Sequence, residues 1–176
     1  MKIVSSKIPQ ESLTQKYLPC NFWDVYKCAI QSESAITPDD LQVAFWTHQP
    51  KWLAKLFSIR NAIVKWFGLK TDKGESGKVE QCIRNGGTYN MMSVAGKSGK
   101  ETAIILKDKH LSAYMSVYIE DNQSNSKDIY VITIVHFHNL LGYIYFYAIA
   151  PFHKIVVKGM MKHTLKRIIT KQNNTP

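Results

Sequence analysis

Two histidines in the second half of the chain have a spacing that could support chemistry. His136 and His138 are separated by one residue in a segment rich in β-branched residues. A strand there places both side chains on the face shared with Ile132 and Ile134. Such a pair can chelate a metal, anchor the polar end of a ligand, act as an acid or base, or satisfy backbone groups at a corner of the fold. A third metal ligand would have to come from His110, His153, Asp108 or Asp24. We favour the structural role over a metal, and we expect no metal or other cofactor.

Asp24 is the other candidate, because it is a lone carboxylate among aromatic residues of the segment 20–31. A buried carboxylate needs a partner, and Arg60 is the candidate partner. A pair that orders helices against a sheet is favoured over catalysis. Signals for a nucleophile are poor, since there is no G-x-S-x-G motif. The segment Gly96–Lys100 resembles a phosphate loop but lacks the leading glycine, so it predicts a hairpin.

A row of lysines at i,i+4 spacing marks the last part of the chain. Of the net charge of +10, a surplus of six belongs to residues 129–176, which contain no acid. The row is Lys154, Lys158, Lys162 and Lys166. We interpret it first as the solvated side of an amphipathic helix and second as a weak contact with an anionic membrane surface. Nucleic acid is disfavoured, because the aromatic residues do not alternate with these lysines.

Length and composition limit the class of protein. The chain has 176 residues, of which 45% are hydrophobic and 20% charged, so one globular domain is expected. A multidomain enzyme, a fibrous array and a disulfide-stapled miniprotein are excluded. Cys20, Cys28 and Cys82 lack a zinc spacing and predict free thiols in a reducing compartment, hence a cytoplasmic protein. Residues 129–153 carry no formal charge, but polar residues 136–139 interrupt them, so we predict a buried strand and a buried helix there.

Periodicity predicts the elements that must position these residues. A strand over 20–31 is followed by a helix over 37–47, where Thr37 caps and Pro38 opens the first turn, and by a helix over 50–68. Further strands are expected at 79–84, 88–95, 101–107, 110–120 and 128–138. Within 110–120 the residues Met115 and Val117 face the core. A helix over 141–169 follows, which Pro151 should kink or split.

This order predicts an α+β fold of the helix-grip (START/Bet v 1-like) architecture. A curved antiparallel sheet wraps around the long C-terminal helix, and two short helices follow the first strand. The expected organisation is an N-terminal extension (1–18), one domain (19–170) and a frayed tail (171–176).

Several strings, in order along the chain, resemble the bacterial DUF2867 family. They are 57–61 (FSIRN), 67–69 (FGL), 108–111 (DKHL), 135–139 (VHFHN) with Gly142 and Tyr145, and 151–156 (PFHKIV). Together they cover about residues 20–170. The family is similar to the START/polyketide-cyclase-like superfamily, which implies the fold named above. In some family members the domain follows a short-chain dehydrogenase-like domain, which implies a functional link to such a protein.

The resemblance also implies a function, because superfamily members hold apolar ligands beneath the C-terminal helix. We therefore expect an apolar or amphipathic small molecule between sheet and helix, with its polar end recognised by His136, His138, Arg60 or Asp24. The apolar lining would come from Met115, Val117, Phe152, Val156 and Met160. Two alternatives stay open: a cyclase- or isomerase-like enzyme that uses a pocket histidine, and binding of an anionic membrane or nucleic acid through the basic helix. Whether a reaction occurs, which ligand binds and the oligomeric state are not decided by the sequence.

Overall fold

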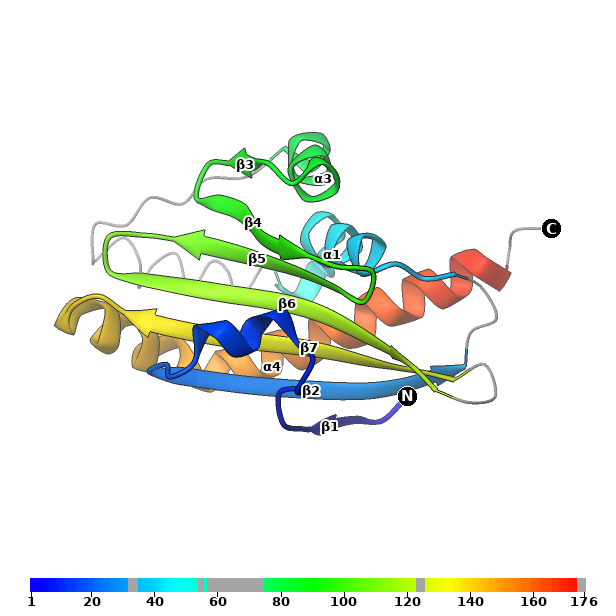
Figure 1. Ribbon diagram of the computed structural model, residues 1–176, viewed down its shortest axis with the longest axis horizontal. Helices are drawn as coiled ribbons and strands as arrows, with labels where there is room; N and C mark the ends of the chain where they lie inside the picture. Colours follow the sequence, from blue (N-terminus) through cyan, green and yellow to red (C-terminus); the bar gives the residue numbers. More distant parts are fainter. Residues whose placement is uncertain (32–34, 54–55, 57–74, 123–125, 174–176) are drawn as a thin grey trace.

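The structure is a computed structural model, and it describes residues 1–31, 35–53, 56, 75–122 and 126–173. Within these residues the chain forms a seven-stranded antiparallel sheet with the strand order β1-β2-β7-β6-β5-β4-β3. The strands are β1 (Ile3–Ser5), β2 (Phe22–Gln31), β3 (Thr88–Tyr89), β4 (Met92–Lys97), β5 (Glu101–Lys107), β6 (Leu111–Asp121) and β7 (Ser126–Phe137). The helices are η1 (Leu13–Tyr17), α1 (Pro38–Thr47), α3 (Ser76–Asn85) and α4 (Leu140–Asn173). The predicted α+β class, with a curved antiparallel sheet and a long C-terminal helix, is confirmed (Figure 1).

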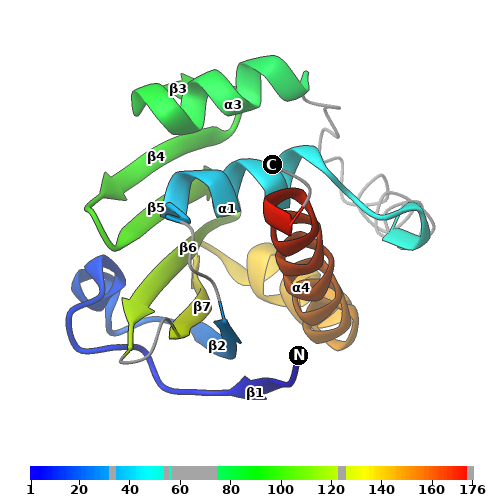
Figure 2. The ribbon, with the colours of Figure 1, turned by 90° about the vertical axis from the view of Figure 1, so that its right-hand side faces the viewer.

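Different parts of the chain cover the two faces of the sheet. Helix α4 packs on one face together with α1 and α3, and we call this the inner face (Figure 2). The short helix η1 lies against the opposite, outer face, in front of the strands in Figure 1. Val157, Met160 and Leu165 of α4 join the main core beneath the sheet. The long helix is therefore part of the core and not an appendage.

The alternation predicted for the strands is confirmed. Met115 and Val117 of β6 lie in the inner core, whereas Tyr114 and Tyr118 belong to an apolar cluster on the outer face. In β2, Tyr26 faces the inner core and Val25 the outer cluster. Because both faces are covered, the register between strands decides which side chains can meet.

Helix α1 begins as the sequence predicts. The side chain of Thr37 accepts a hydrogen bond from the backbone N–H of Asp40, and Pro38 occupies the first turn. One face of α1 is fixed by Gln42, which is fully buried. Its side-chain amide donates to the carbonyl oxygens of Thr102 and Met115 at 2.8 and 3.1 Å. Buried amide donors are thus satisfied by the sheet, which holds α1 to the inner face.

The strand predicted over 79–84 is wrong, because this segment is helix α3. Val79, Cys82 and Ile83 are spaced by three and four residues and bury one helical face against α1 and the sheet. Gly86 ends the helix in the left-handed conformation, with φ of 75°. The Asn85-Gly86-Gly87 sequence is therefore a helix end and not a turn between strands.

Other boundaries differ from the expectations in smaller ways. The predicted strand 88–95 is divided into β3 and β4 by a turn at Asn90, which has a positive φ. Helix α4 runs as one element through Pro151, so the predicted split does not occur. The predicted extension 1–18 contributes β1, which pairs with β2, and the helix η1. Most of the predicted helix 50–68, with Arg60, lies outside the described residues.

A buried carboxylate holds η1 against the outer face. Glu101 of β5 is fully buried and accepts hydrogen bonds from the hydroxyls of Ser12 and Ser116 at 2.8 and 2.5 Å. Its second oxygen accepts from the backbone N–H of Leu13 at 2.6 Å. Hydrogen bonds to a charged group are stronger than neutral ones, and a buried carboxylate without them is costly. Glu101 therefore anchors η1, which forms part of the wall of the hollow described below.

The Glu101→Ala variant should lose about 3 kcal/mol in free energy of unfolding, because three donors lose their buried acceptor. Amide hydrogen exchange of residues 13–17 should accelerate with it, since η1 loses its anchor. Urea denaturation and exchange mass spectrometry measure the two effects. The matched control is Glu75→Ala, at an exposed carboxylate paired with Lys78, which should cost less than about 1 kcal/mol. Equal losses in both variants would contradict the anchoring role.

Candidate functional site

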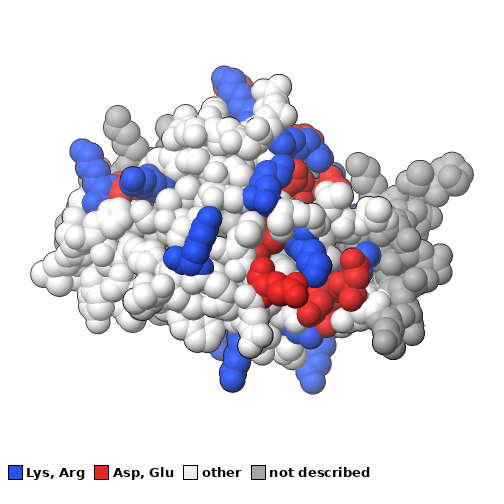
Figure 3. Space-filling view, in the orientation of Figure 1, with Lys and Arg blue, Asp and Glu red and all other residues white. Residues whose placement is uncertain are grey.

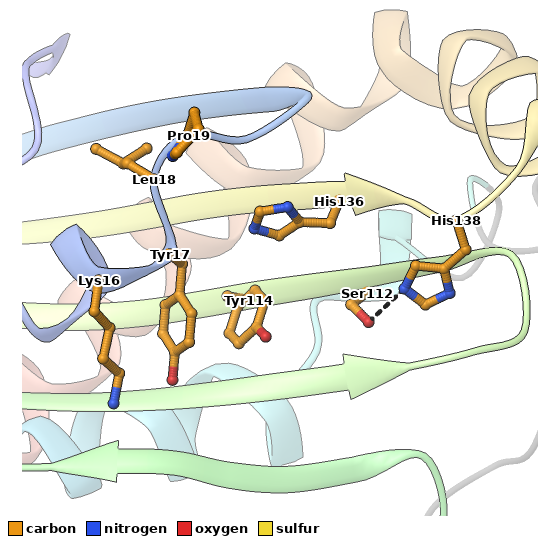
Figure 4. A pocket seen from close by; sticks show the side chains of 8 residues that line it. All are labelled: Lys16, Tyr17, Leu18, Pro19, Ser112, Tyr114, His136 and His138. Atoms are coloured by element: carbon orange, nitrogen blue, oxygen red, sulfur yellow. Dashed lines mark hydrogen bonds between the residues drawn. The ribbon is translucent and has the colours of Figure 1, made fainter.

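An open hollow of about 400 Å³ lies on the outer face of the sheet (Figure 4). Its walls come from η1 and the two residues after it, and its floor comes from β6 and the end of β7. The lining residues are Lys16, Tyr17, Leu18, Pro19, Ser112, Tyr114, His136 and His138. The volume falls within the range of small-molecule sites, roughly 300–1,000 Å³.

The pairing of β6 with β7 brings the floor residues together. Ser112 lies opposite His136 in the register, and Tyr114 lies opposite Ile134. The rings of Tyr114 and Tyr17 stack with centroids 3.9 Å apart, which joins the floor to η1. The rings of His136 and Tyr114 meet edge to face, with their centroids 5.9 Å apart. The hollow is thus formed by aromatic residues from three elements far apart in the sequence.

His138 is held by two hydrogen bonds at one end of the hollow. Its Nδ1 lies 3.3 Å from the carbonyl oxygen of Lys109, and its Nε2 lies 3.0 Å from the hydroxyl of Ser112. A carbonyl oxygen only accepts, so Nδ1 carries a proton. In the tautomer with that proton alone, Nε2 accepts from the Ser112 hydroxyl, and the imidazole orients this hydroxyl.

Three other polar groups of the hollow have no hydrogen-bond partner among the described residues: the Lys16 ammonium, the His136 ring nitrogens and the Tyr114 hydroxyl. Lys16 lies over the Tyr17 ring, 5.0 Å from its centroid. Burial raises the pKa of Tyr114, so this hydroxyl stays neutral and able to donate. A cation and neutral donors around one space favour an anionic group.

The charge on this face is unevenly spread. Figure 3 shows the acidic side chains gathered mainly toward the right-hand part of the outer face. The left-hand part, over the ends of β6 and β7 where the hollow lies, is largely uncharged apart from a few basic side chains and a small acidic spot between them (Figures 1 and 3). An anion in the hollow would therefore meet no concentration of negative charge.

Asp24 lies on the inner face, where its partner is a histidine of α4. The carboxylate of Asp24 is 3.2 Å from Nε2 of His153. Its expected partner, Arg60, lies outside the described residues. Burial, and then the charge of Asp24 and a hydrogen bond to it, raise the pKa of Tyr26 well above its usual value. Next to Asp24 in the register, the buried hydroxyl of Thr133 has no partner within the described part of the chain.

The structure does not bring the predicted polar residues to one place. His136 and His138 line the outer hollow, while Asp24 and His153 lie across the sheet on the inner face. They therefore cannot bind one ion or contact one small ligand together. In the residues that the structure describes, no group of three His, Cys, Asp or Glu could hold a metal ion.

The predicted apolar lining residues mostly pack in the core. Met115, Val117 and Met160 are buried in the inner cluster, Val156 packs against it, and the Phe152 side chain is 38% exposed. A cavity beside Val117, bounded by α1, α4 and the sheet, has a volume of about 10 Å³. Such a space holds about one water at most. The described residues thus fill the region where the sequence predicts a ligand.

Sequence reasoning found only His136 and His138 among the eight residues that line the hollow. Lys16, Tyr17, Ser112 and Tyr114 were not among the candidates. The alternation of 110–120 already put Ser112 and Tyr114 on one face, and the pairing of β6 with β7 places this face beside His136. Nothing in the local sequence indicates that η1 folds over that face.

The profile of a family described as "Protein of unknown function (DUF2867)" matches residues 18–160. No curated protein matches the chain.

The raised tyrosine pKa on the inner face predicts a pH dependence of stability. Between the ordinary tyrosine pKa of about 10 and the higher folded value, the unfolded chain has lost a proton that the folded chain keeps. The contribution of Tyr26 to the free energy of unfolding should therefore be constant below about pH 9 and fall as the pH rises through 10. In Tyr26→Phe the fall should be less steep, by about 1.4 kcal/mol per pH unit.

Urea denaturation between about pH 9 and about pH 11 measures this difference in slope. Tyr143→Phe, at a half-exposed ring on α4, is the control for loss of a hydroxyl. A slope in Tyr26→Phe equal to that of the unmodified protein would contradict the assignment.

Proposed function

The chain belongs to the DUF2867 family, and from that premise we propose that it binds a small anionic molecule with a flat apolar part in the hollow on the outer face. The observation that carries the proposal is a ligand-sized space whose lining holds unpartnered donors. Lys16, His136 and Tyr114 provide a cation and two polar groups within that one space. Binding sites for small molecules combine an apolar wall with a few convergent polar groups in this way.

The lining also indicates how such a molecule would lie. A carboxylate or phosphate beside His136 would gain a hydrogen bond that this ring lacks in the described chain. The Lys16 ammonium, on the other side of the Tyr17 ring in Figure 4, would attract the anion through its charge. The apolar part would rest on Leu18 and Pro19, which continue the wall formed by η1 (Figure 4). The carbonyl of Lys109 and the hydroxyl of Ser112 already satisfy His138, so it acts as support and not as a primary contact.

We place the ligand on the outer face in preference to the inner one expected from START/polyketide-cyclase-like proteins. Membership of that superfamily is itself a proposal, supported by the curved sheet and the long helix. The space beside Val117 on the inner face is about 10 Å³, which is too small for an apolar ligand. In this proposal His136 has the expected role of recognising a polar group, but at a different place, and His138 supports the site.

Binding of 8-anilinonaphthalene-1-sulfonate, an anionic flat molecule, tests the proposal through its fluorescence. It should bind with one-to-one stoichiometry, and Lys16→Met or His136→Phe should each weaken binding about tenfold, the value of one charge-assisted hydrogen bond. The matched control is Lys2→Met, at an exposed lysine away from the hollow, which should leave the affinity unchanged. Ile144→Gln tests whether the dye binds instead to the exposed apolar residues of α4, and it should leave the affinity for the hollow unchanged. Unchanged affinity in both hollow variants would contradict the proposal.

A second candidate function, catalysis in the same hollow, is favoured by one observation. The Ser112 hydroxyl donates to Nε2 of His138, and the Lys109 carbonyl orients that base. A hydroxyl on a base that a third group orients can be an activated nucleophile. With an ester, Ser112 Oγ would bond to the carbonyl carbon while its proton moves to His138. That proton would pass to the departing alcohol as its C–O bond breaks, and water would release the acid by the same steps.

Hydrolysis of p-nitrophenyl acetate tests this second function. The rate should fall at least about a hundredfold in Ser112→Ala, because the nucleophile is removed. Ser98→Ala, in the exposed turn between β4 and β5, is the matched control and should keep the rate. Equal rates in the Ser112→Ala variant and the unmodified protein would exclude catalysis by this pair, without affecting the binding proposal.

A further inference from the structure

The first half of α4 exposes a continuous apolar surface. Leu140 is 72% exposed, Ile155 is 59% exposed, and Tyr143, Ile144 and Tyr147 are each nearly half exposed. Leu140, Ile144, Tyr147, Pro151 and Ile155 recur every three or four residues and so share one side of the helix. Single exposed apolar residues are ordinary, but a contiguous set marks an interaction surface.

The lysine row continues the same side of α4. Lys158, Lys162 and Lys166 follow Ile155 at intervals of three and four residues, and Lys154 lies beside it. Lys154, Lys162 and Lys166 are exposed, and Lys158 lies over the Tyr26 ring, 5.0 Å from its centroid. One side of the helix is therefore apolar over its first four turns and basic over the rest. We call this surface the α4 stripe.

The helix is long and apolar enough to cross a membrane by length and composition, over Leu140–Thr170, and 22% of its most apolar stretch is buried. Its other side, however, is part of the protein. Val157, Met160, Met161 and Leu165 pack in the main core, and Tyr145 and Phe146 are also buried. A helix spanning the bilayer would have to leave that core. The arrangement fits a helix that lies on a membrane surface.

Charge identifies the kind of surface that would cover the stripe. Residues 129–176 contain no acid, so the lysines of α4 have no negative neighbours along the helix. Anionic lipid attracts basic residues near the surface, while tyrosine rings and aliphatic side chains prefer the boundary between headgroups and acyl chains. An apolar protein partner would match the first half of the stripe but not the second.

We propose that the α4 stripe docks the protein on the surface of an anionic lipid bilayer. Leu140, Ile144 and Tyr147 enter the boundary between headgroups and acyl chains. Lys162 and Lys166 contact lipid phosphates farther along the helix. The docking is peripheral and reversible, because α4 keeps its inner side in the core. This proposal is independent of the hollow on the outer face, which lies on the other side of the sheet.

Co-flotation of the full chain with vesicles tests the proposal. The protein should bind vesicles of phosphatidylcholine with about one third phosphatidylglycerol and not phosphatidylcholine alone, and binding should weaken from about 0.1 M to about 0.5 M NaCl. Lys162→Gln/Lys166→Gln should lower the vesicle affinity about thirtyfold. Ile144→Gln/Ile155→Gln should lower it at least about tenfold, through loss of apolar burial.

Matched variants remove the same groups elsewhere on the surface. Lys2→Gln/Lys7→Gln removes two exposed lysines, and Met91→Gln removes a side chain that is 41% exposed in the turn between β3 and β4. Both should bind vesicles as the unmodified protein does. Circular dichroism and thermal unfolding establish that the α4 variants are folded, since all four substituted side chains lie outside the buried residues.

Three results would overturn the proposal. The first is absence of vesicle binding at low salt, and the second is binding that is equal in the α4 variants and in the controls. The third is a stable dimer that Ile144→Gln/Ile155→Gln converts to a monomer in analytical ultracentrifugation, without vesicle binding. That third result would assign the stripe to a second copy of the chain.

Discussion

The alternation of side chains along β7 is the constraint on which the rest of the structure depends. This strand is central in the sheet, and both of its faces are covered: Val131 packs in the inner core, while Ile132 and Ile134 are fully buried on the outer face. A shift of one residue in the register of β7 would exchange its inner and outer side chains, so that each buried side chain would face the wrong cluster. Because of the same alternation, His136 lies in the outer hollow and Phe137 packs against the aromatic rings of α4 on the inner face.

The two faces are closed by different means, and this creates the hollow. A helix of 34 residues, α4, runs along the inner side and leaves a cavity of only about 10 Å³. The outer side receives a five-residue helix, η1, held by the buried carboxylate of Glu101. So short an element cannot cover the whole face, and the ends of β6 and β7 remain open beside it. The position of the hollow therefore follows from the length of η1 and the place of its anchor.

Local signals in the sequence were sufficient for much of the fold. Period-two alternation identified β2, β6 and β7, and for β6 also the face that packs in the core, and Thr37 with Pro38 identified the start of α1. A strand was expected at 79–84, although Val79, Cys82 and Ile83 have helical spacing, because six residues are too few to distinguish the two periods. Tertiary packing decides which face of the sheet α4 covers. It also brings His153 to Asp24, from which it is separated by 129 residues in the sequence. That is why His136 and Asp24 were expected at one site and lie on opposite faces.

The opposite placement of the two surfaces has a consequence for how they would work together. The sheet separates the hollow from the α4 stripe, so a bilayer beneath α4 would leave the hollow facing water. The two surfaces nevertheless approach each other at one end, because His138 of the hollow is followed two residues later by Leu140 of the stripe. Docking and ligand binding would not compete for the same residues. An anionic ligand in the hollow would meet the repulsion of the negative lipid most strongly at that end, where salt screens it over about 10 Å.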